Sequence, residues 1–470
     1  MKNTLEQLSS FIVETDINAL PDRVIQQAKW HLLDTLGAAL VGSTSTEARR
    51  TLHLLKRSEK EGCATVWGTD SRLSPRSAAF ANGVAAHAFE LDDTGGCDHS
   101  GAVVIPALLA TLPLCECKPS GNELLTAMVI GYDVARRVLE ACGGYSSHNG
   151  AGWHSTGTCG VFGAAAGCAS LLDLNNNATA SALGLSASFS GGLWAFIHDG
   201  SQSKKLHAAR AAEGGLLAAL SAQSGISGPQ YVFDEVWGGF LSTLAGDQAR
   251  PSALTDELGK LWKIERCSIK PYASCRGTHT SIDALGLIID DNALEAREIE
   301  SIEVRLSPFL AKMCGTRDID SLASAQMSLP YALAARMLFG RVDLDAYSDA
   351  CRSSAEIHEL MSLITLVVDG QLTADTEPSV MLTTRKGSRI TKRVDIALGS
   401  PGNQLSHHAL ANKFYTLANR ILPTSSVDIV MRNCMKLDAL DDLSLFEAAL
   451  SCRSASPDDT TCEIQGVTHQ

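Results

Sequence analysis

The sequence predicts a mostly α-helical protein in which one large all-helical domain is interrupted by a smaller α+β domain. Three observations support this fold class. Apolar residues recur at helical spacing through the first two-thirds of the chain. Alternation of apolar and polar residues, which is typical of strands, begins only after about residue 267. Helical spacing then returns from about residue 405.

The first part of the helical domain, residues 1–266, contains a series of helical segments. In residues 16–41 the helix is expected to begin after Leu20, with Pro21 in the first turn, where proline is tolerated. Further helical segments are residues 75–91, 102–114, 121–142, 158–172, 178–189 and 206–224. They are rich in Ala and Gly, and glycine costs about 1 kcal/mol inside a helix. We therefore expect these helices to approach one another closely.

The α+β domain is expected to span residues 267–404. Strand patterns cover residues 299–307, 379–384 and 390–398, and a turn at Lys386 and Gly387 joins the last two. Helical patterns at residues 281–289 and 327–339 lie among them. Residues 405–450 are expected to complete the helical domain, and residues 451–470 to form a disordered polar tail.

Composition and charge exclude several classes of protein. With 470 residues, 45% of them apolar, the chain can bury a large core without disulfides or metal. The net charge of −13 is unsuited to nucleic acid or an anionic membrane, so we expect neither as a partner. The 14 cysteines are scattered without a C-x-x-C pair, which predicts free thiols in a reducing compartment and no cysteine-bound metal.

Recognisable targeting and catalytic motifs are absent from the sequence. The N-terminus lacks the pattern of a signal peptide, and the longest apolar run, residues 102–115, is too short to span a bilayer. There is no G-x-S-x-G elbow, no Walker A loop, no H-E-x-x-H and no G-x-G-x-x-G after a strand. We expect a cytoplasmic protein outside the common nucleotide-binding, serine-hydrolase and zinc-protease classes.

Four segments concentrate ionisable side chains among glycines and other small residues. They are residues 87–102 with Glu90, Thr94 and His99, residues 152–160 with His154, residues 199–207 with Lys204 and Lys205, and residues 269–279 with Lys270 and His279. Taken singly, each has a plainer interpretation as an acidic loop, a structural histidine, a surface lysine pair or a charged hinge. Together they offer a cationic set for a small polycarboxylate. Such a ligand needs counter-charges, because burying unpaired carboxylates costs several kcal/mol per charge.

At these segments the sequence resembles the MmgE/PrpD family. The shared motifs are Glu-Leu-Asp-Asp-Thr at 90–94, His-Ser-Gly-Ala-Val-Val-Ile-Pro at 99–106, Gly-Trp-His-Ser-Thr-Gly-Thr-Cys-Gly at 152–160, Asp-Gly-Ser-Gln-Ser-Lys-Lys-Leu-His at 199–207, Lys-Pro-Tyr-Ala-Ser-Cys-Arg at 270–276 and Gln-Met-Ser-Leu-Pro-Tyr at 326–331. The family contains 2-methylcitrate dehydratases, cis-aconitate decarboxylases and iminodisuccinate epimerase. The resemblance implies that the α+β domain is a lid, that the pocket lies between the two domains, that the protein is a homodimer and that it uses no cofactor.

The resemblance also implies roles for individual residues. A decarboxylase-type pocket maps onto Glu90, Thr94, His99, His154, Lys204, Lys270 and Tyr331. His99, helped by His154, is expected to move the proton, and the lysines are expected to hold a carboxylate. Tyr331 or Thr94 is expected to orient the substrate. Glu90 is expected to act as a second base or to fix the tautomer of His99. Lys205 and His279 are assigned to substrate binding.

Departures from the family patterns leave the reaction open. Glu90 stands where animal members have an aspartate, and the stretch from Thr94 to His99 is one residue shorter. We expect a cofactor-free lyase that resembles cis-aconitate decarboxylase. The alternatives are a 2-methylcitrate (alkylcitrate) dehydratase, an iminodisuccinate-type epimerase and a non-catalytic binding relative. A hydrolytic metal enzyme built on His87, Glu90, Asp93 and His99 is a further alternative, although we expect no metal.

Overall fold

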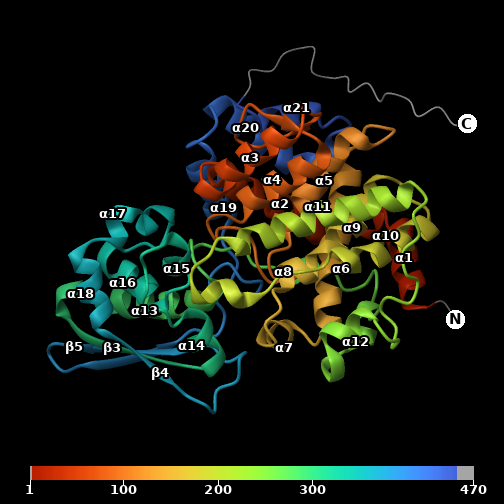
Figure 1. The fold of residues 1–470 in the computed structure, drawn as a ribbon. Helices are drawn as coiled ribbons and strands as arrows, with labels where there is room; N and C mark the ends of the chain where they lie inside the picture. The colour runs from red at the N-terminus through yellow and green to blue at the C-terminus, as the bar shows by residue number, and fades with distance from the viewer. Residues whose placement is uncertain (1–2, 453–470) are drawn as a thin grey trace, which may run out of the picture.

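The computed structural model describes residues 3–452 and divides them between two hydrophobic cores (Figure 1). The larger core belongs to a helical domain, and the smaller one to a domain with a four-stranded sheet. The fold class predicted from the sequence is therefore confirmed. Most of the predicted polar tail, from residue 453 onward, lies outside the described residues.

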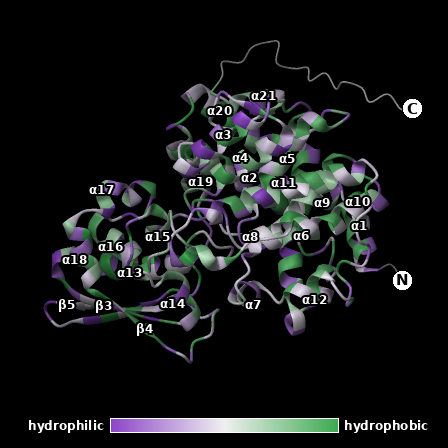
Figure 2. Cartoon of the chain, in the orientation of Figure 1, coloured by the Kyte–Doolittle hydropathy of each residue, from purple (hydrophilic) through white to green (hydrophobic). Residues whose placement is uncertain are grey.

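The helical domain is an aggregate of packed helices. Its longer helices are α1 (Thr4–Glu14), α2 (Asp22–Gly42), α3 (Thr46–Ser58), α4 (Pro75–Ala86), α5 (Gly101–Thr111), α6 (Gly121–Ala141), α9 (Gly160–Leu171), α10 (Asn176–Ser186) and α11 (Ser203–Gln223). Helices α5 and α9 are apolar almost all round and lie at the centre, where Figure 2 shows the densest hydrophobic colouring. A Cβ on Gly163 of α9 would lie only 2.4 Å from the carbonyl oxygen of Gly131 in α6, so glycine allows the close approach that the composition predicted.

The chain returns to the helical domain after the lid. Helices α19 (His407–Ala418) and α20 (Thr424–Met435) pack against α2, and α21 (Ser444–Ala449) packs against α20. Lys413 of α19 reaches the interior, where its Nζ donates to Asp34 Oδ1 (2.6 Å) and to the carbonyl oxygen of Leu91 (2.8 Å). The return segment therefore supports the loop that carries Glu90.

The lid is built on a sheet with strand order β4-β3-β5-β6. Strand β3 (Ile299–Leu306) pairs in parallel with β4 (Ile364–Val368) and antiparallel with β5 (Ser379–Thr384), which pairs with β6 (Arg389–Arg393). Helices α13 (His279–Asn292), α16 (Leu329–Phe339) and α18 (Ala355–Ser362) lie on one side of the sheet (Figure 1). The sequence did not predict β4, because a short apolar run without alternation does not distinguish a strand from a helix.

Three expected element bounds need correction. Pro21 is the residue immediately before α2 and not its first residue. The expected helix over residues 75–91 ends at Ala86, and Glu90, inside the expected range, adopts a left-handed backbone (φ 54°) that a helix cannot contain. The expected strand over residues 390–398 ends at Arg393.

Two global expectations can be compared with the described part of the chain. No helix within residues 3–452 is both long enough and apolar enough to cross a membrane. Every cysteine in that range is a free thiol.

Candidate active site

The loop between α4 and α5, residues 87–100, is anchored by a buried aspartate. Asp93 Oδ2 accepts from His31 Nδ1 (2.9 Å) and from the Tyr132 hydroxyl (2.6 Å), and its Oδ1 accepts from the Gly101 backbone N–H (2.9 Å). The Asp93 carboxylate therefore faces the helical core and holds the start of α5. It does not join the site as the metal-enzyme alternative required.

A short backbone pairing brings a distant segment against this loop. The N–H of Thr94 donates to the Ser268 carbonyl (3.0 Å), and the N–H of Ser268 donates to the Thr94 carbonyl (2.7 Å). Gly95 lies in the left-handed region (φ 93°), and a Cβ there would lie 2.7 Å from the Arg266 carbonyl oxygen. The pairing thus depends on a glycine at this position, and it places Lys270 beside the loop.

Three lysines surround the Glu90 carboxylate. Lys204 Nζ and Lys205 Nζ both donate to Glu90 Oε1, at 2.6 and 2.7 Å. Lys270 Nζ lies 3.5 Å from Glu90 Oε2, and neither of these two atoms has a hydrogen-bond partner among the described residues. All four side chains are buried. The cluster thus places three lysine side chains around one carboxylate and leaves the Lys270 ammonium group without a hydrogen-bond acceptor among the described residues.

The position of two of these lysines is locally unfavourable. Lys204 and Lys205 occupy the first turn of α11, where the helix dipole favours negative charge. Burial opposes the ionisation of Glu90, but Lys204, Lys205 and Lys270 outweigh it and hold the pKa of this carboxyl well below its usual range. Burial also lowers the pKa of Lys205, whose pairing with Glu90 is opposed by the charge of Lys204. Buried lysines in the first turn of a helix go against the local electrostatic preference, and such a conflict in a native fold often marks a functional site.

His99 is held between two aspartates. Its Nδ1 lies 2.9 Å from the Asp93 carbonyl oxygen and 3.0 Å from Asp92 Oδ2, and its Nε2 lies 3.4 Å from Asp98 Oδ2. Both partners of Nδ1 are acceptors, so Nδ1 carries a proton. Burial alone would lower the pKa of His99, but the charges of Asp98 and Asp92 outweigh it and raise that pKa. Asp92, and not Glu90 as expected, therefore fixes the ring.

Further imidazoles lie behind His99. The ring centroids of His99 and His87 are 4.3 Å apart, and those of His99 and His154 are 6.5 Å apart. His154 Nδ1 lies 3.0 Å from His207 Nδ1, so one of these two nitrogens donates to the other. Burial and then the charge of Lys204 hold the pKa of His154 well below its usual range. His154 Nε2 has no hydrogen-bond partner among the described residues.

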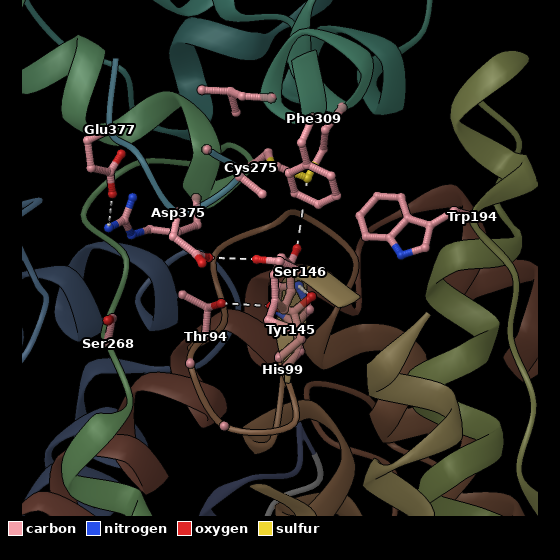
Figure 3. Close-up of a pocket in the computed structure, with 18 of the residues that line it drawn as sticks. Thr94, His99, Tyr145, Ser146, Trp194, Ser268, Cys275, Phe309, Asp375 and Glu377 are labelled. Atoms are coloured by element: carbon pink, nitrogen blue, oxygen red, sulfur yellow. Dashed lines mark hydrogen bonds and ion pairs between the residues drawn. The ribbon is translucent and has the colours of Figure 1, made fainter. Parts of the chain in front are cut away.

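The described residues enclose a cavity of about 330 Å³ between the helical domain and the lid. Figure 3 shows Thr94 and His99 on one side of it and Phe309 and Cys275 on the opposite side. The Thr94 hydroxyl donates to Asp98 Oδ1 (2.8 Å) at the cavity wall. The wall is formed mainly by Glu90, Thr94, Asp98, His99, Tyr145, Trp194, Lys204, Cys275, Arg276, Phe309, Leu310, Met313, Asp375 and Glu377.

Five expected site residues do not line this wall: His154, Lys205, Lys270, Tyr331 and His279. Lys205 and Lys270 lie directly behind Glu90, whereas Tyr331 and His279 lie within the lid. The Tyr331 hydroxyl donates to the carbonyl oxygen of Ala346, and its ring packs against Tyr347 (centroids 5.0 Å apart) inside the lid core. His279 Nε2 lies 3.3 Å from the Ser274 carbonyl oxygen, and its ring is buried at the start of α13. Neither side chain lines the cavity in the described part of the chain.

One group of side chains has the spacing of a metal site. Ligand atoms of His87, Asp92 and His99 all lie within 4.8 Å of one another. The two histidines already direct Nδ1 at Asp92, His87 at 3.0 Å. Asp92 thus pairs with one nitrogen of each ring, while His87 Nε2 has no hydrogen-bond partner among the described residues.

Several functional candidates were not selected from the sequence. Asp92 and Asp98 flank His99, and His207 contacts His154. Asp92 lies within the Glu-Leu-Asp-Asp-Thr motif, but a motif does not reveal which of two neighbouring aspartates faces the site. His207 follows the lysines by one helical turn, which was the available signal for it.

The fold and the site together define a class of protein: a helical domain and an inserted α+β lid with a cavity between them, beside which buried lysines and histidines gather. Comparison with known families identifies the class. Residues 6–252 match the MmgE/PrpD N-terminal domain, and residues 272–437 match the MmgE/PrpD C-terminal domain. The chain therefore belongs to the MmgE/PrpD family.

Similar curated proteins have related names. The chain is 32% identical to the cis-aconitate decarboxylase-like protein oryM of Aspergillus oryzae, over 78% of this chain and 80% of that protein. It is 28% identical to cis-aconitate decarboxylase of Homo sapiens, over 96% of this chain and 95% of that protein. It is also 28% identical to cis-aconitate decarboxylase of Aspergillus terreus, over 93% and 94%.

Proposed function

We propose that the chain is a cofactor-free carboxy-lyase that decarboxylates a small unsaturated polycarboxylate of the cis-aconitate type. One observation carries the proposal: a cluster of Lys204, Lys205 and Lys270 lies near His99, whose two ring nitrogens face the carboxylates of Asp92 and Asp98. The names of the similar proteins support decarboxylation over other reactions of this family.

In this mechanism the lysine cluster binds a carboxylate that conjugates with the reacting carbon. Lys270, which lacks a hydrogen-bond acceptor in the resting site, gains one from the substrate. The bond to the departing carboxyl group breaks, carbon dioxide leaves, and the electron pair is delocalised toward the carboxylate that the lysines hold. Preorganised ammonium groups stabilise this developing charge without reorganisation.

His99 completes the reaction by protonating carbon. Its Nδ1 proton is retained by Asp92 and the Asp93 carbonyl, so the proton on Nε2 is the one available for transfer. Asp98 holds that Nε2–H in the resting site and releases it when the carbanion forms. A positioned acid of this kind typically contributes about 10²–10⁴-fold to the rate.

Proton NMR in D₂O tests this function against the alternatives. The purified protein is incubated without added metal with cis-aconitate, 2-methylcitrate and iminodisuccinate in turn. Formation of itaconate from cis-aconitate supports the proposal. An alkene formed from 2-methylcitrate supports the dehydratase, and deuterium exchange into iminodisuccinate without net conversion supports the epimerase. Binding without turnover of any of the three supports a non-catalytic relative.

We further propose a homodimer, as the family resemblance implies. Large apolar side chains are exposed on the segment over residues 226–237, where Trp237 is fully accessible and Tyr231 is 63% exposed. Aromatic residues on a surface are typical anchors of protein interfaces. Sedimentation velocity should give twice the mass of one chain, and Trp237→Ser should shift the equilibrium toward the monomer.

A further inference from the structure

Tyr145 lines the cavity at the start of α7 (Tyr145–Gly150), directly after two glycines. Gly143 and Gly144 both have left-handed backbones (φ 89° and 86°). A Cβ on Gly143 would also lie 2.9 Å from the carbonyl oxygen of Gln248. Residues with side chains would be strained at this turn, so the glycine pair allows the tight connection from α6 to α7 that places Tyr145 on the cavity wall.

The Tyr145 ring is held by the lid, but its hydroxyl has only a weak partner. The ring meets Phe309 of α14 (Pro308–Cys314) edge to face, with centroids 6.4 Å apart. The hydroxyl lies 3.8 Å from Met313 Sδ, a contact that Figure 3 shows as a dashed line from Tyr145 toward the lid. A thioether sulfur is a weak acceptor, so the phenolic proton is not firmly committed.

Other tyrosines of the chain have oxygen partners. The Tyr132 hydroxyl donates to Asp93 (2.6 Å), that of Tyr272 to Asp283 (2.6 Å), and that of Tyr415 to Asp428 (3.1 Å). Within residues 3–452, the hydroxyl of Tyr145 has no such oxygen partner. A polar group of this kind beside a cavity is normally satisfied by water or by a ligand.

The acid on this part of the cavity wall does not take up the Tyr145 hydroxyl. Asp98 Oδ1 already accepts from the Thr94 hydroxyl (2.8 Å), and its Oδ2 lies 3.4 Å from His99 Nε2. Burial and the charge of Asp98 hold the pKa of Tyr145 well above its usual range. The hydroxyl therefore stays protonated and is available as a neutral hydrogen-bond donor.

We propose that the Tyr145 hydroxyl binds the substrate, by donating a hydrogen bond to a carboxylate that Lys270 does not hold. The inference rests on the proposed function, because it adds a second recognition point to the same site. Lys270 offers one ammonium group without an acceptor among the described residues, and a polycarboxylate needs at least one further donor. A neutral donor suits this position, since a second cation beside His99 would lower the pKa of that ring by repulsion.

This assignment gives Tyr145 the orienting role that was expected of Tyr331. The Tyr331 hydroxyl is committed to the carbonyl oxygen of Ala346, and its side chain does not line the cavity. Tyr145 therefore determines how the substrate is oriented relative to His99.

Binding of tricarballylate tests the contact without turnover. This saturated tricarboxylate cannot be decarboxylated through a conjugated carbanion, so calorimetric titration measures its affinity even if the proposed reaction fails. Tyr145→Phe keeps the ring that packs against Phe309 and removes the hydroxyl alone. Its Kd for tricarballylate should rise about 10–150-fold, as expected when a hydrogen bond to a charged group is lost. A Kd within about twofold of the wild-type value would overturn the inference.

Butyrate identifies the partner of the hydroxyl. This ligand has a single carboxylate, which we expect at Lys270, so its affinity for Tyr145→Phe and for the wild type should be equal. Displacement titration against tricarballylate measures this weak binding. An equal loss for both ligands would show that the hydroxyl acts only through the shape of the cavity, and would contradict the proposed contact.

Steady-state decarboxylation of cis-aconitate separates binding from chemistry. Tyr145→Phe should raise KM about tenfold or more and leave kcat nearly unchanged, as when an interaction common to substrate and transition state is removed. Tyr145→Met is a second variant if the first does not fold. The matched control is Tyr415→Phe, which removes a tyrosine hydroxyl that pairs with Asp428 and does not line the cavity.

The two measurements keep the two proposals apart. If the wild type releases no carbon dioxide but Tyr145→Phe still weakens tricarballylate, the proposed reaction fails and the binding role of Tyr145 stands. If the wild type decarboxylates and Tyr145→Phe binds and turns over like it, the reaction stands and the role of Tyr145 is refuted.

Discussion

Lys270 gives the sharpest test of the anion site, because its charge is buried without a hydrogen bond. Its side chain is 1% exposed, and Nζ lies 3.5 Å from Glu90 Oε2. At this separation and an effective dielectric constant of about 20, attraction to Glu90 is worth about 5 kcal/mol. Desolvation of the ammonium costs several kcal/mol, and Lys204 and Lys205 repel it. The two sides nearly cancel, so the resting protein gains little stability from this charge.

The substitution Lys270→Met keeps the apolar stem and removes the charge. The free energy of unfolding should change by no more than about 1 kcal/mol, while kcat/KM should fall about 10²–10³-fold, as when one charge-stabilising donor is lost. Urea denaturation and steady-state decarboxylation kinetics measure the two quantities. The opposite result, a loss of more than about 3 kcal/mol of stability with activity retained, would refute the reasoning and make Lys270 a structural ion-pair partner.

A matched control uses another buried lysine. Lys29 is 2% exposed, and its Nζ pairs with Asp438 at 2.7 Å, far along the chain from the cavity residues. Lys29→Met breaks a pair that is already formed, so it should cost about 1–3 kcal/mol of stability and leave kcat/KM unchanged.

Other perturbations address the proton donor, the lid tyrosine and metal dependence. His99→Gln should lower kcat about 10²–10⁴-fold in single-turnover experiments. Burial lowers the pKa of His99, but the charge of Asp98 outweighs it, so the net shift is upward. Activity should therefore fall as pH rises through that pKa. Asp98→Asn should move the alkaline limb of the kcat/KM profile to lower pH. Tyr331→Phe should leave kcat/KM unchanged and cost about 0.5–1.5 kcal/mol of stability in urea. Dialysis against a chelator should not reduce activity; loss that zinc restores would instead support a metal site.

Much of the fold was predictable because its signals are local. Helical spacing in one window, and alternation in another, identified the two domains and most of their elements. Strand β4 (Ile364–Val368) was missed because its partner β3 is about 60 residues away, and pairing, not local pattern, defines it. The end of α4 was misplaced because small and apolar residues continue past Ala86, although the backbone at Glu90 is left-handed.

The motifs predicted which residues form much of the candidate site, but not which way each side chain points. Lys204, Lys270 and His99 were identified, and they converge. Asp92 and Asp93 are neighbours with opposite orientations, one toward the histidines and one toward the Tyr132 hydroxyl. Which of them faces the site depends on packing against α2 and α6, which the sequence does not display.

The contact of Lys413 with the Leu91 carbonyl has a consequence for the order in which the protein forms. Leu91 follows Glu90 directly, so the loop of the anion site lacks this support until residue 413 has been synthesised. The 146 residues from 267 to 413 take roughly 7–30 s to translate at about 5–20 residues per second. All residues of the lid are thus synthesised before this contact can form, and the loop that carries Glu90 lacks it until then.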